Sequence, residues 1–265
     1  MAPPTPSDNW QRGDSYERFM GRWSRRLAPR FLAWLGAPAG RRWLDVGSGT
    51  GALCSTVLEH CAPSSVIGVE PSEGFLAKAK QQVAGVTFHQ GSATAIPLRD
   101  RAVDVTVSGL VLNFVPDARA ALAEMMRVTD TSGTIGIYVW DYSGGMQIIR
   151  YFWDAAAEVN PGQGLDESQR FPLCRQAALT ELFGVAGLGD VEVSTVEIPT
   201  PFSSFDDYWL PFLGGQGPAP AYAMSLDEAT RARLRDRLRA RLPIRADGSI
   251  ELTARAWAAR GTVAK

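Results

Sequence analysis

The sequence LDVGSGTG, residues 44–51, places three glycines within five positions directly behind an apolar run. Glycine adds little to a hydrophobic core, but it permits tight turns and lets a ligand approach the backbone closely. A short apolar strand that leads through such a loop into a helix is typical of α/β proteins that bind a cofactor. The loop therefore predicts an α/β fold and a ligand beside residues 47–51.

Short runs rich in Val and Ile alternate with helical patterns along much of the chain after residue 41. This alternation is typical of a doubly wound, parallel sheet with helices packed on it. The expected strands are 42–46, 66–70, 86–90, 103–108, 134–140, 190–198 and 250–260, and the expected helices are 51–61, 72–83, 117–128 and 226–242. Ser225 and Glu228 have the spacing of a capping box for the last of these helices.

The remaining segments are expected to surround the sheet within one domain, residues 14–265, after a flexible, Pro-rich tail at 1–13. Residues 14–36 predict a helical cap: one helix begins at Tyr16, and Pro29 permits a second short helix that ends at Gly36. Residues 141–185 are aromatic and irregular. Together with 200–245 they are interpreted as lid segments on the substrate side.

Composition excludes several classes of function. The net charge is −1, which gives no electrostatic reason to expect a nucleic-acid partner. The three cysteines have neither zinc-site spacing nor the density of a disulfide scaffold, so no metal is expected and a reducing cytoplasm fits best. The first ten residues lack the apolar core of a signal peptide, and no uncharged run approaches the roughly 18 to 20 residues of a membrane span. We expect a cytoplasmic monomer or homodimer without a membrane partner.

Two of three ligand hypotheses for the glycine loop can be compared by motif. The phosphate-loop motif ends in Gly-Lys-Ser/Thr, whereas residues 51–53 read Gly-Ala-Leu. A dinucleotide fits better, because Gly47, Gly49 and Ala52 satisfy G-x-G-x-x-G/A and Glu70 follows at a distance suited to ribose hydroxyls. The third hypothesis is another adenosine-bearing cofactor. It also accounts for Asp45 inside the strand and for the long helical cap that precedes it.

Four segments in their linear order resemble the class I S-adenosylmethionine-dependent methyltransferases, in particular the methyltransferase type 11 group. WLDVGSGTG (43–51) is similar to the first motif of the family, and VIGVEPSEGFLAKAKQ (66–81) to its second strand with the acidic end. GSATAIPLRDRAVDVTVSGLVLNFVPD (91–117) resembles the segment from the adenine contact through the fourth strand. MMRVTDTSGTIGIYVWD (125–141) resembles the following helix and fifth strand, and the cap sequence 16–35 looks like that of one branch of the group.

The resemblance implies a Rossmann-like sheet of seven strands, mostly parallel with the last strand antiparallel, and helices on both faces. It implies S-adenosyl-L-methionine as cofactor and S-adenosyl-L-homocysteine as product. Glu70 would accept the ribose hydroxyls, and Tyr16 and Arg22 would meet the carboxylate. Ser92 stands where the family usually has Asp, so its neutral hydroxyl would lack charge assistance toward the adenine amino group. The implied cofactor site comprises Tyr16, Arg22, Trp23, Asp45, Gly47, Ser48, Gly49, Gly51, Glu70, Pro71, Ser72, Ser92, Ala93, Leu110 and Asn113.

The implied reaction is in-line methyl transfer to a small, partly hydrophobic molecule. His60 and His89 lie in places that do not suit a general base, which leaves Asp141 and Tyr142 as candidate proton acceptors. Two alternatives remain: a nucleotide-dependent oxidoreductase on the same class of sheet, and a non-catalytic S-adenosylmethionine-binding protein.

Overall fold

The computed structural model describes residues 17–161, 167–214 and 217–264 of the 265-residue chain. The predicted tail 1–13 and Tyr16 lie outside the described residues. The chain forms two compact units. The sheet unit comprises 24–140, 172–196 and 256–264, and the described residues of the helical unit are 17–23, 141–161, 167–171, 197–214 and 217–255.

The sheet unit is built on one seven-stranded sheet with the order β3-β2-β1-β4-β5-β7-β6. The first five strands run parallel to their neighbours, and β7 pairs antiparallel to β5, so the expected architecture is confirmed. The chains of β6 and β7 continue from the sheet unit into the helical unit. The strands are β1 (Arg42–Val46), β2 (Ser65–Glu70), β3 (Val86–Gln90), β4 (Val103–Gly109), β5 (Thr129–Trp140), β6 (Gly189–Phe202) and β7 (Ile250–Thr262).

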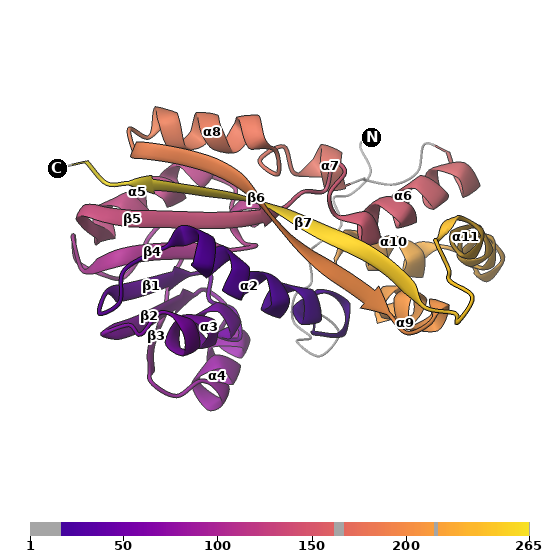
Figure 1. Ribbon diagram of the computed structural model, residues 1–265, viewed down its shortest axis with the longest axis horizontal. Helices are drawn as coiled ribbons and strands as arrows, with labels where there is room; N and C mark the ends of the chain where they lie inside the picture. Colours follow the sequence, from indigo (N-terminus) through magenta and orange to yellow (C-terminus); the bar gives the residue numbers. More distant parts are fainter. Residues whose placement is uncertain (1–16, 162–166, 215–216, 265) are drawn as a thin grey trace. The chain divides into compact units, whose positions relative to one another are not determined.

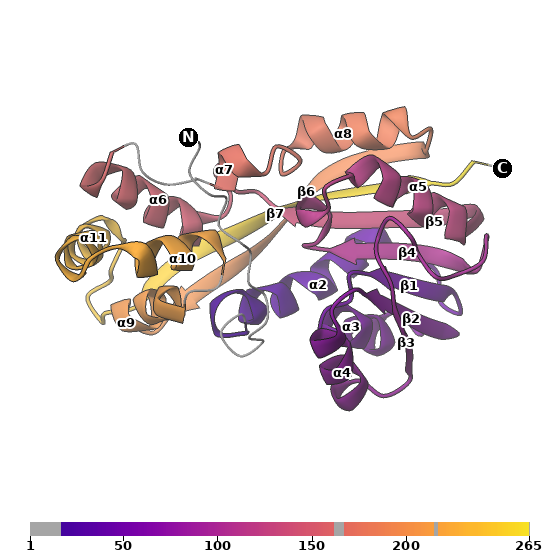
Figure 2. The same cartoon turned by 180° about the vertical axis from the view of Figure 1, so that it is seen from behind.

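Helices cover both faces of this sheet, as expected from the alternating pattern. Helices α2, α3 and α4 lie on one face, and α5 and α8 lie on the other (Figures 1 and 2). The core strands are apolar on both faces because both are covered; Leu44, Val46, Val105 and Val107 are buried. The helical elements are α2 (Arg22–Leu35), α3 (Ala52–His60), α4 (Glu73–Gln82), the 3-10 turn η2 (Leu112–Phe114), α5 (Ala118–Val128) and α8 (Gln176–Val185).

The cap sequence forms the π-helical turn η1 (Glu17–Gly21) and then a single helix, so the predicted break at Pro29 is wrong. Proline removes one backbone donor and disfavours a helix interior. Burial of the apolar face offsets this cost, because Leu27 and Phe31 on either side of Pro29 are completely buried. The helix ends where predicted. Gly36 has φ +66°, and its N–H donates to the carbonyl of Leu32 at 3.1 Å.

Residues 141–185 were predicted to be irregular, and that prediction is wrong for 176–185, which form α8, and for 147–159 in the helical unit. This segment forms α6, whose residues Ile148, Ile149, Phe152 and Trp153 recur at helical spacing and are buried. Its aromatic content obscured a helical pattern. The helical elements of this unit are α6 (Gln147–Val159), α7 (Glu167–Arg170), α9 (Phe205–Trp209), the 3-10 turn η3 (Leu210–Gly214), α10 (Pro218–Ser225) and α11 (Glu228–Arg241).

Stacked aromatic rings fill the core of the helical unit. The ring of Phe212 stacks on that of Phe152 with centroids 4.6 Å apart, and its centroid lies 5.0 Å from that of Phe19 and 5.3 Å from that of Tyr208. The Tyr208 hydroxyl is buried and donates to the carbonyl of Ile148 at 2.8 Å. Aromatic pairs of this kind add to the stabilisation that comes from area burial alone.

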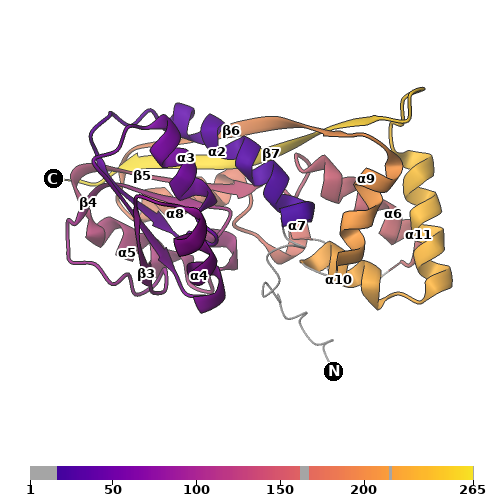
Figure 3. The ribbon, with the colours of Figure 1, turned by 90° about the horizontal axis from the view of Figure 1, so that it is seen from below.

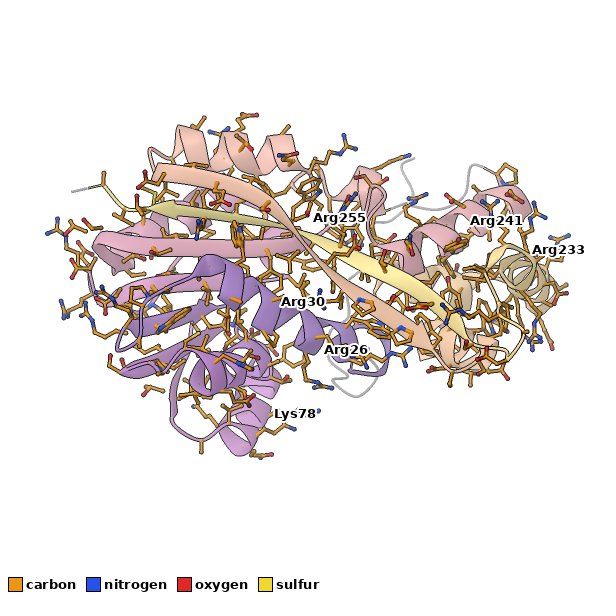
Figure 4. All side chains as sticks on the ribbon, in the orientation of Figure 1. Arg26, Arg30, Lys78, Arg233, Arg241 and Arg255 are labelled. Atoms are coloured by element: carbon orange, nitrogen blue, oxygen red, sulfur yellow. The ribbon has the colours of Figure 1, made fainter. Side chains whose placement is uncertain are left out.

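Helix α11 lies against α6, as Figure 3 shows, and arginines on its surface are paired with α6. Arg237 and Arg241 both donate to Glu158, and Arg241 is labelled in Figure 4. The predicted capping box is wrong. Asp227 is the cap and accepts from the N–H of Thr230 at 2.7 Å, whereas the hydroxyl of Ser225 donates to the carbonyl of Tyr222. No helix in the described parts of the chain is both long and apolar enough to cross a bilayer.

Candidate functional site

The glycine loop leaves β1 in a left-handed conformation. Gly47, Gly49 and Gly51 have φ of +76°, +53° and +87°. A Cβ on Gly47 would lie 2.5 Å from Val111, and one on Gly51 would lie 2.9 Å from Val83, so internal packing requires both glycines. A Cβ on Gly49 would meet no atom within 4 Å. The backbone at Gly49 is therefore the part of the loop that is open to a ligand.

Glu70, at the end of β2, holds this loop through hydrogen bonds to its carboxylate. One oxygen accepts the N–H of Gly49 and the other accepts the N–H of Ser72, each at 2.9 Å. Burial raises the pKa of Glu70, and the two backbone hydrogen bonds oppose that shift. A carboxylate has about four acceptor positions, so each oxygen keeps capacity for one more donor. Two vicinal hydroxyl groups would use that remaining capacity.

Asp45, inside β1, has partners within the protein. The thiol of Cys54 lies 3.3 Å from its carboxylate, and both side chains are buried. Burial raises the pKa of Asp45 to about 7, although hydrogen bonds from the thiol and the backbone N–H of Cys54 oppose the shift. The N-cap residue of α3, Gly51, has no side chain, and the contact between the Cys54 thiol and Asp45 joins the first turn of this helix to β1. Direct contact of Asp45 with a cofactor stays a prediction.

The segments after β2 and β3 contribute the predicted adenine contacts. Pro71 and Ser72 are exposed at the start of α4, where Ser72 caps the helix. Ser92 heads a turn after β3: its hydroxyl accepts the N–H of Thr94 at 3.2 Å, and its carbonyl accepts the N–H of Ala95 at 3.1 Å. Ser92 is exposed in this turn and Ala93 is half-buried.

The segment after β4 carries a strained residue and an unsatisfied donor. Leu110 has φ +61°, which is uncommon for a residue other than glycine, and its N–H donates to the carbonyl of Tyr138 at 2.8 Å. The amide nitrogen of Asn113 and the hydroxyl of Ser48 are buried and have no hydrogen-bond partner among the described residues. Buried polar groups normally find partners, so both atoms fit contacts to a polar ligand.

The predicted residues of the sheet unit thus gather at one place. They follow the carboxyl ends of β1, β2, β3 and β4, which are neighbours in the sheet and run parallel. In open α/β sheets ligands bind at this edge. An open backbone at Gly49, a carboxylate with spare acceptor capacity and two unsatisfied polar atoms fit a ligand that carries a ribose and other polar groups.

Arg22 and Trp23 belong to the helical unit. The guanidinium of Arg22 donates to the Asp207 carboxylate at 2.8 Å and lies over the rings of Trp23 and Phe202. Burial raises the pKa of Asp207, but hydrogen bonds from Arg22 and Ser203 outweigh this effect and lower it. The assignment of Arg22, Trp23 and Tyr16 to the cofactor stays a prediction.

The candidate proton acceptor Asp141 is also in the helical unit, and its carboxylate has several donors. Ser143 donates through its hydroxyl at 2.6 Å, and Gly145 through its N–H at 3.1 Å. Arg255 of β7, labelled in Figure 4, donates through Nη2 at 2.6 Å and Nε at 2.9 Å. Burial raises the pKa of Asp141, but the hydrogen bonds from Ser143 and Arg255 outweigh this effect and lower the pKa. Tyr142 is buried beside Phe171. Proton-acceptor roles for Asp141 and Tyr142 stay predictions.

Two residues near the site were missed by sequence reasoning. Glu124 and Arg127 of α5 form hydrogen bonds to the backbone of the segment that follows Ser92. Their spacing of three on a helix indicates an ion pair. Nothing in the sequence indicates that the pair is also bonded to a distant loop.

Sequence comparison relates the chain to known proteins. Residues 44–137 match the family model of the methyltransferase domain. An uncharacterised protein of Mycobacterium tuberculosis is 30% identical over 225 residues, which cover 80% of this chain and 77% of that protein. A demethylmenaquinone methyltransferase of Renibacterium salmoninarum is 35% identical over 101 residues, 38% of this chain and 42% of that protein.

Solved structures share the fold. A phosphoethanolamine N-methyltransferase of Haemonchus contortus, in complex with S-adenosylhomocysteine, has a TM-score of 0.57 and 19% identity over 98% of this chain and 58% of that one. A candidate methyltransferase of Bacillus halodurans has a TM-score of 0.59 and 12% identity over 90% of this chain and 99% of that one. The matched motifs do not favour the oxidoreductase alternative. The chain belongs to the class I S-adenosylmethionine-dependent methyltransferases of the type 11 group, and S-adenosylmethionine is its cofactor.

Proposed function

We propose that this enzyme methylates a nucleophilic atom of a small, partly hydrophobic molecule by in-line displacement. The observation that carries the proposal is the arrangement at the carboxyl edge of the sheet. There Glu70 holds the glycine loop and keeps acceptor capacity for two hydroxyls, beside a backbone that is open at Gly49. Adenosine binding at this edge would leave the methyl-bearing end of the cofactor free to meet an acceptor.

Different residues of the sheet unit would bind different parts of the cofactor. Glu70 would accept both ribose hydroxyls, and Ser92 would accept a hydrogen bond from the adenine amino group. The buried amide nitrogen of Asn113 and hydroxyl of Ser48 would form hydrogen bonds with the polar methionine end of the cofactor. Asp45 would support the loop from β1, because its contact with the Cys54 thiol joins β1 to the first turn of α3.

When bound, S-adenosylmethionine supplies a methyl group that is already activated on a sulfonium. The protein then needs mainly to align the acceptor and exclude water, and well-oriented reactants can lower a barrier by about 7 to 11 kcal/mol. Little acid-base chemistry is required. The many donors on the Asp141 carboxylate support a mechanism without a strong general base, because they stabilise the ionised form.

The proposal of a partly hydrophobic acceptor comes from the composition of the sequence. Residues 141–160 and 208–213 are rich in aromatic side chains, but Phe152, Tyr208 and Phe212 pack on one another in the core of the helical unit. A demethylmenaquinone methyltransferase is among the relatives by sequence, whereas the structural neighbour from Haemonchus contortus is a phosphoethanolamine N-methyltransferase. The type of sheet thus occurs with acceptors of different polarity, and the acceptor must be identified by its own chemistry.

A screen for release of S-adenosylhomocysteine tests the proposal. The purified protein is incubated with S-adenosylmethionine and with small-molecule extracts that have been fractionated by hydrophobicity. We expect product release with fractions of intermediate hydrophobicity, and much less with Glu70→Ala when the cofactor is below saturation. Binding of the cofactor without turnover in any fraction would favour the non-catalytic alternative. Turnover only with the most polar fractions would contradict the proposed class of acceptor.

A further inference from the structure

An ion pair on α5 is joined to the loop that carries the adenine contacts. The carboxylate of Glu124 accepts from the guanidinium of Arg127 at 2.7 and 2.8 Å, and both side chains are partly buried. The hydrogen bond from Arg127 is the largest cause that lowers the pKa of Glu124, so it favours the ionised carboxylate. The pair is therefore charged at neutral pH.

Both polar backbone groups of Ile96 are bonded to this pair. Its N–H donates to Glu124 at 2.9 Å, and its carbonyl accepts from Nη2 of Arg127 at 3.0 Å. Nη1 of Arg127 also donates to the carbonyl of Leu98 at 2.8 Å and to the carboxylate of Asp100 at 2.9 Å. Ile96 is buried. Hydrogen bonds from charged groups to buried backbone are among the stronger ones in proteins.

The braced residue Ile96 directly follows the turn that begins at Ser92. Ser92 and Ala95 form an isolated antiparallel bridge, so Ile96 is covalently attached to the end of that turn. Pro97 packs against the start of the loop, since a Cβ on Gly91 would lie 2.6 Å from its ring. The turn is thus held between the end of β3 and the side chains of α5.

We propose that Glu124 and Arg127 are positioning residues for adenine recognition and that they set the selectivity for the base. This inference rests on the proposed function, in which Ser92 and Ala93 meet the amino edge of adenine. Ser92 offers a neutral hydroxyl to that edge, without the charge assistance that a carboxylate would give. The strength of such a bond depends on distance and angle, and the brace on Ile96 determines where the hydroxyl lies.

The test compares two ligands that differ only at the edge of the base. Affinities of S-adenosylhomocysteine and of S-inosylhomocysteine, which has a carbonyl in place of the amino group, are measured by calorimetry. Arg127→Gln, Arg127→Lys and Glu124→Gln are compared with the wild-type protein. The matched control is Arg119→Gln, on the same helix, because Arg119 pairs with Glu181 and both side chains are mostly exposed.

We expect the wild-type protein to prefer S-adenosylhomocysteine. Arg127→Gln should lower the affinity for this ligand by about tenfold and the affinity for S-inosylhomocysteine much less. The ratio of the two affinities should therefore fall toward one. Arg127→Lys retains the charge but not the planar guanidinium that reaches two carbonyls. Its ratio of affinities should lie between those of the wild-type protein and Arg127→Gln. Arg119→Gln should leave the ratio unchanged. If Arg127→Gln does not fold, the ratio in Arg127→Lys and Glu124→Gln gives the same test.

An unchanged ratio in the Arg127 and Glu124 variants, even with a lower melting temperature, would show that the pair only stabilises the loop and would overturn the inference. Equal binding of both ligands by the wild-type protein would overturn it as well, because the adenine edge would then not be read. Failure of the wild-type protein to bind either ligand would instead contradict the proposed function. Glu70→Ala separates the two cases, since it should weaken both ligands by the same factor.

Discussion

The carboxylate of Glu70 accepts the N–H of Gly49 at 2.9 Å, so the acidic end of β2 holds the glycine loop that follows β1. The residue that is proposed to bind the ribose therefore also shapes the surface that faces the ligand. Glycine at position 49 leaves that surface open. Binding and loop geometry should respond together to changes at either residue.

The two loop glycines that differ most in surroundings should respond differently to alanine. Gly49→Ala places a methyl group in open space, but residue 49 has φ +53°, which is unfavourable for alanine. The change should cost about 1 to 2 kcal/mol of stability and weaken cofactor binding. Gly47→Ala has a similar backbone cost and in addition collides with Val111 at 2.5 Å, so it should be the less stable variant. Urea unfolding and calorimetry measure the two effects. Normal cofactor affinity in Gly49→Ala would show that the ligand does not approach this residue.

Asp45 should make stability fall as pH rises toward neutrality. Its pKa is about 7 in the folded protein, above the ordinary value of 3.8, so the folded state keeps a proton that the unfolded state has lost. The contribution to stability is fully present below the unfolded pKa and is lost as pH rises through about 7. Within that window the slope should approach about 1.4 kcal/mol per pH unit.

Urea unfolding between pH 5 and 8 tests this slope, with Asp45→Asn as the reference that cannot titrate. Cys54→Ala should move the window to higher pH, because the thiol hydrogen bond lowers the pKa of Asp45. Parallel stability curves for the wild-type protein and Asp45→Asn would contradict the prediction.

Cofactor affinity should fall on acidification, and the fall should occur at a higher pH than for a glutamate with an ordinary pKa. Burial raises the pKa of Glu70, and the protonated group loses acceptor capacity for ribose hydroxyls. Affinity should therefore be full above the raised pKa and decline as pH falls through it. Calorimetric titration with S-adenosylhomocysteine across mildly acid pH measures the decline. The slope should disappear in Glu70→Gln, and its persistence there would assign the titration to another group.

Arg255 should matter more to stability than a surface arginine does. Its partner Asp141 is 1% exposed, so Arg255→Met leaves a buried carboxylate without its cation and should cost about 3 to 5 kcal/mol. Arg245→Met is the matched control, since Arg245 and Glu251 are both about half exposed and such pairs contribute about 0 to 1 kcal/mol. Chemical unfolding compares the variants. Similar losses in both would mean that Asp141 does not depend on Arg255.

The sheet could be predicted because its strands are short, apolar and separated by helices, a pattern that few other folds share. The acidic end at Glu70 and the glycines could be predicted because they belong to a local motif. The continuous helix through Pro29 could not, since burial of Phe31 and Leu27 overrides the local preference of proline. The contacts of Arg127 with Ile96 span 31 positions in sequence, and only the folded chain shows them.

The most direct test of the account is a calorimetric titration of S-adenosylhomocysteine into the wild-type protein and into Glu70→Ala. Glu59→Ala is the control, because Glu59 is an exposed carboxylate on α3 that accepts a hydrogen bond from the neighbouring Ser55. Loss of two charge-assisted hydrogen bonds should weaken binding to Glu70→Ala by about 1.5 to 3 kcal/mol or more and leave Glu59→Ala unchanged. Equal affinity in the wild-type protein and Glu70→Ala would contradict the assignment of the ribose to the end of β2, and with it the site proposed at this edge of the sheet.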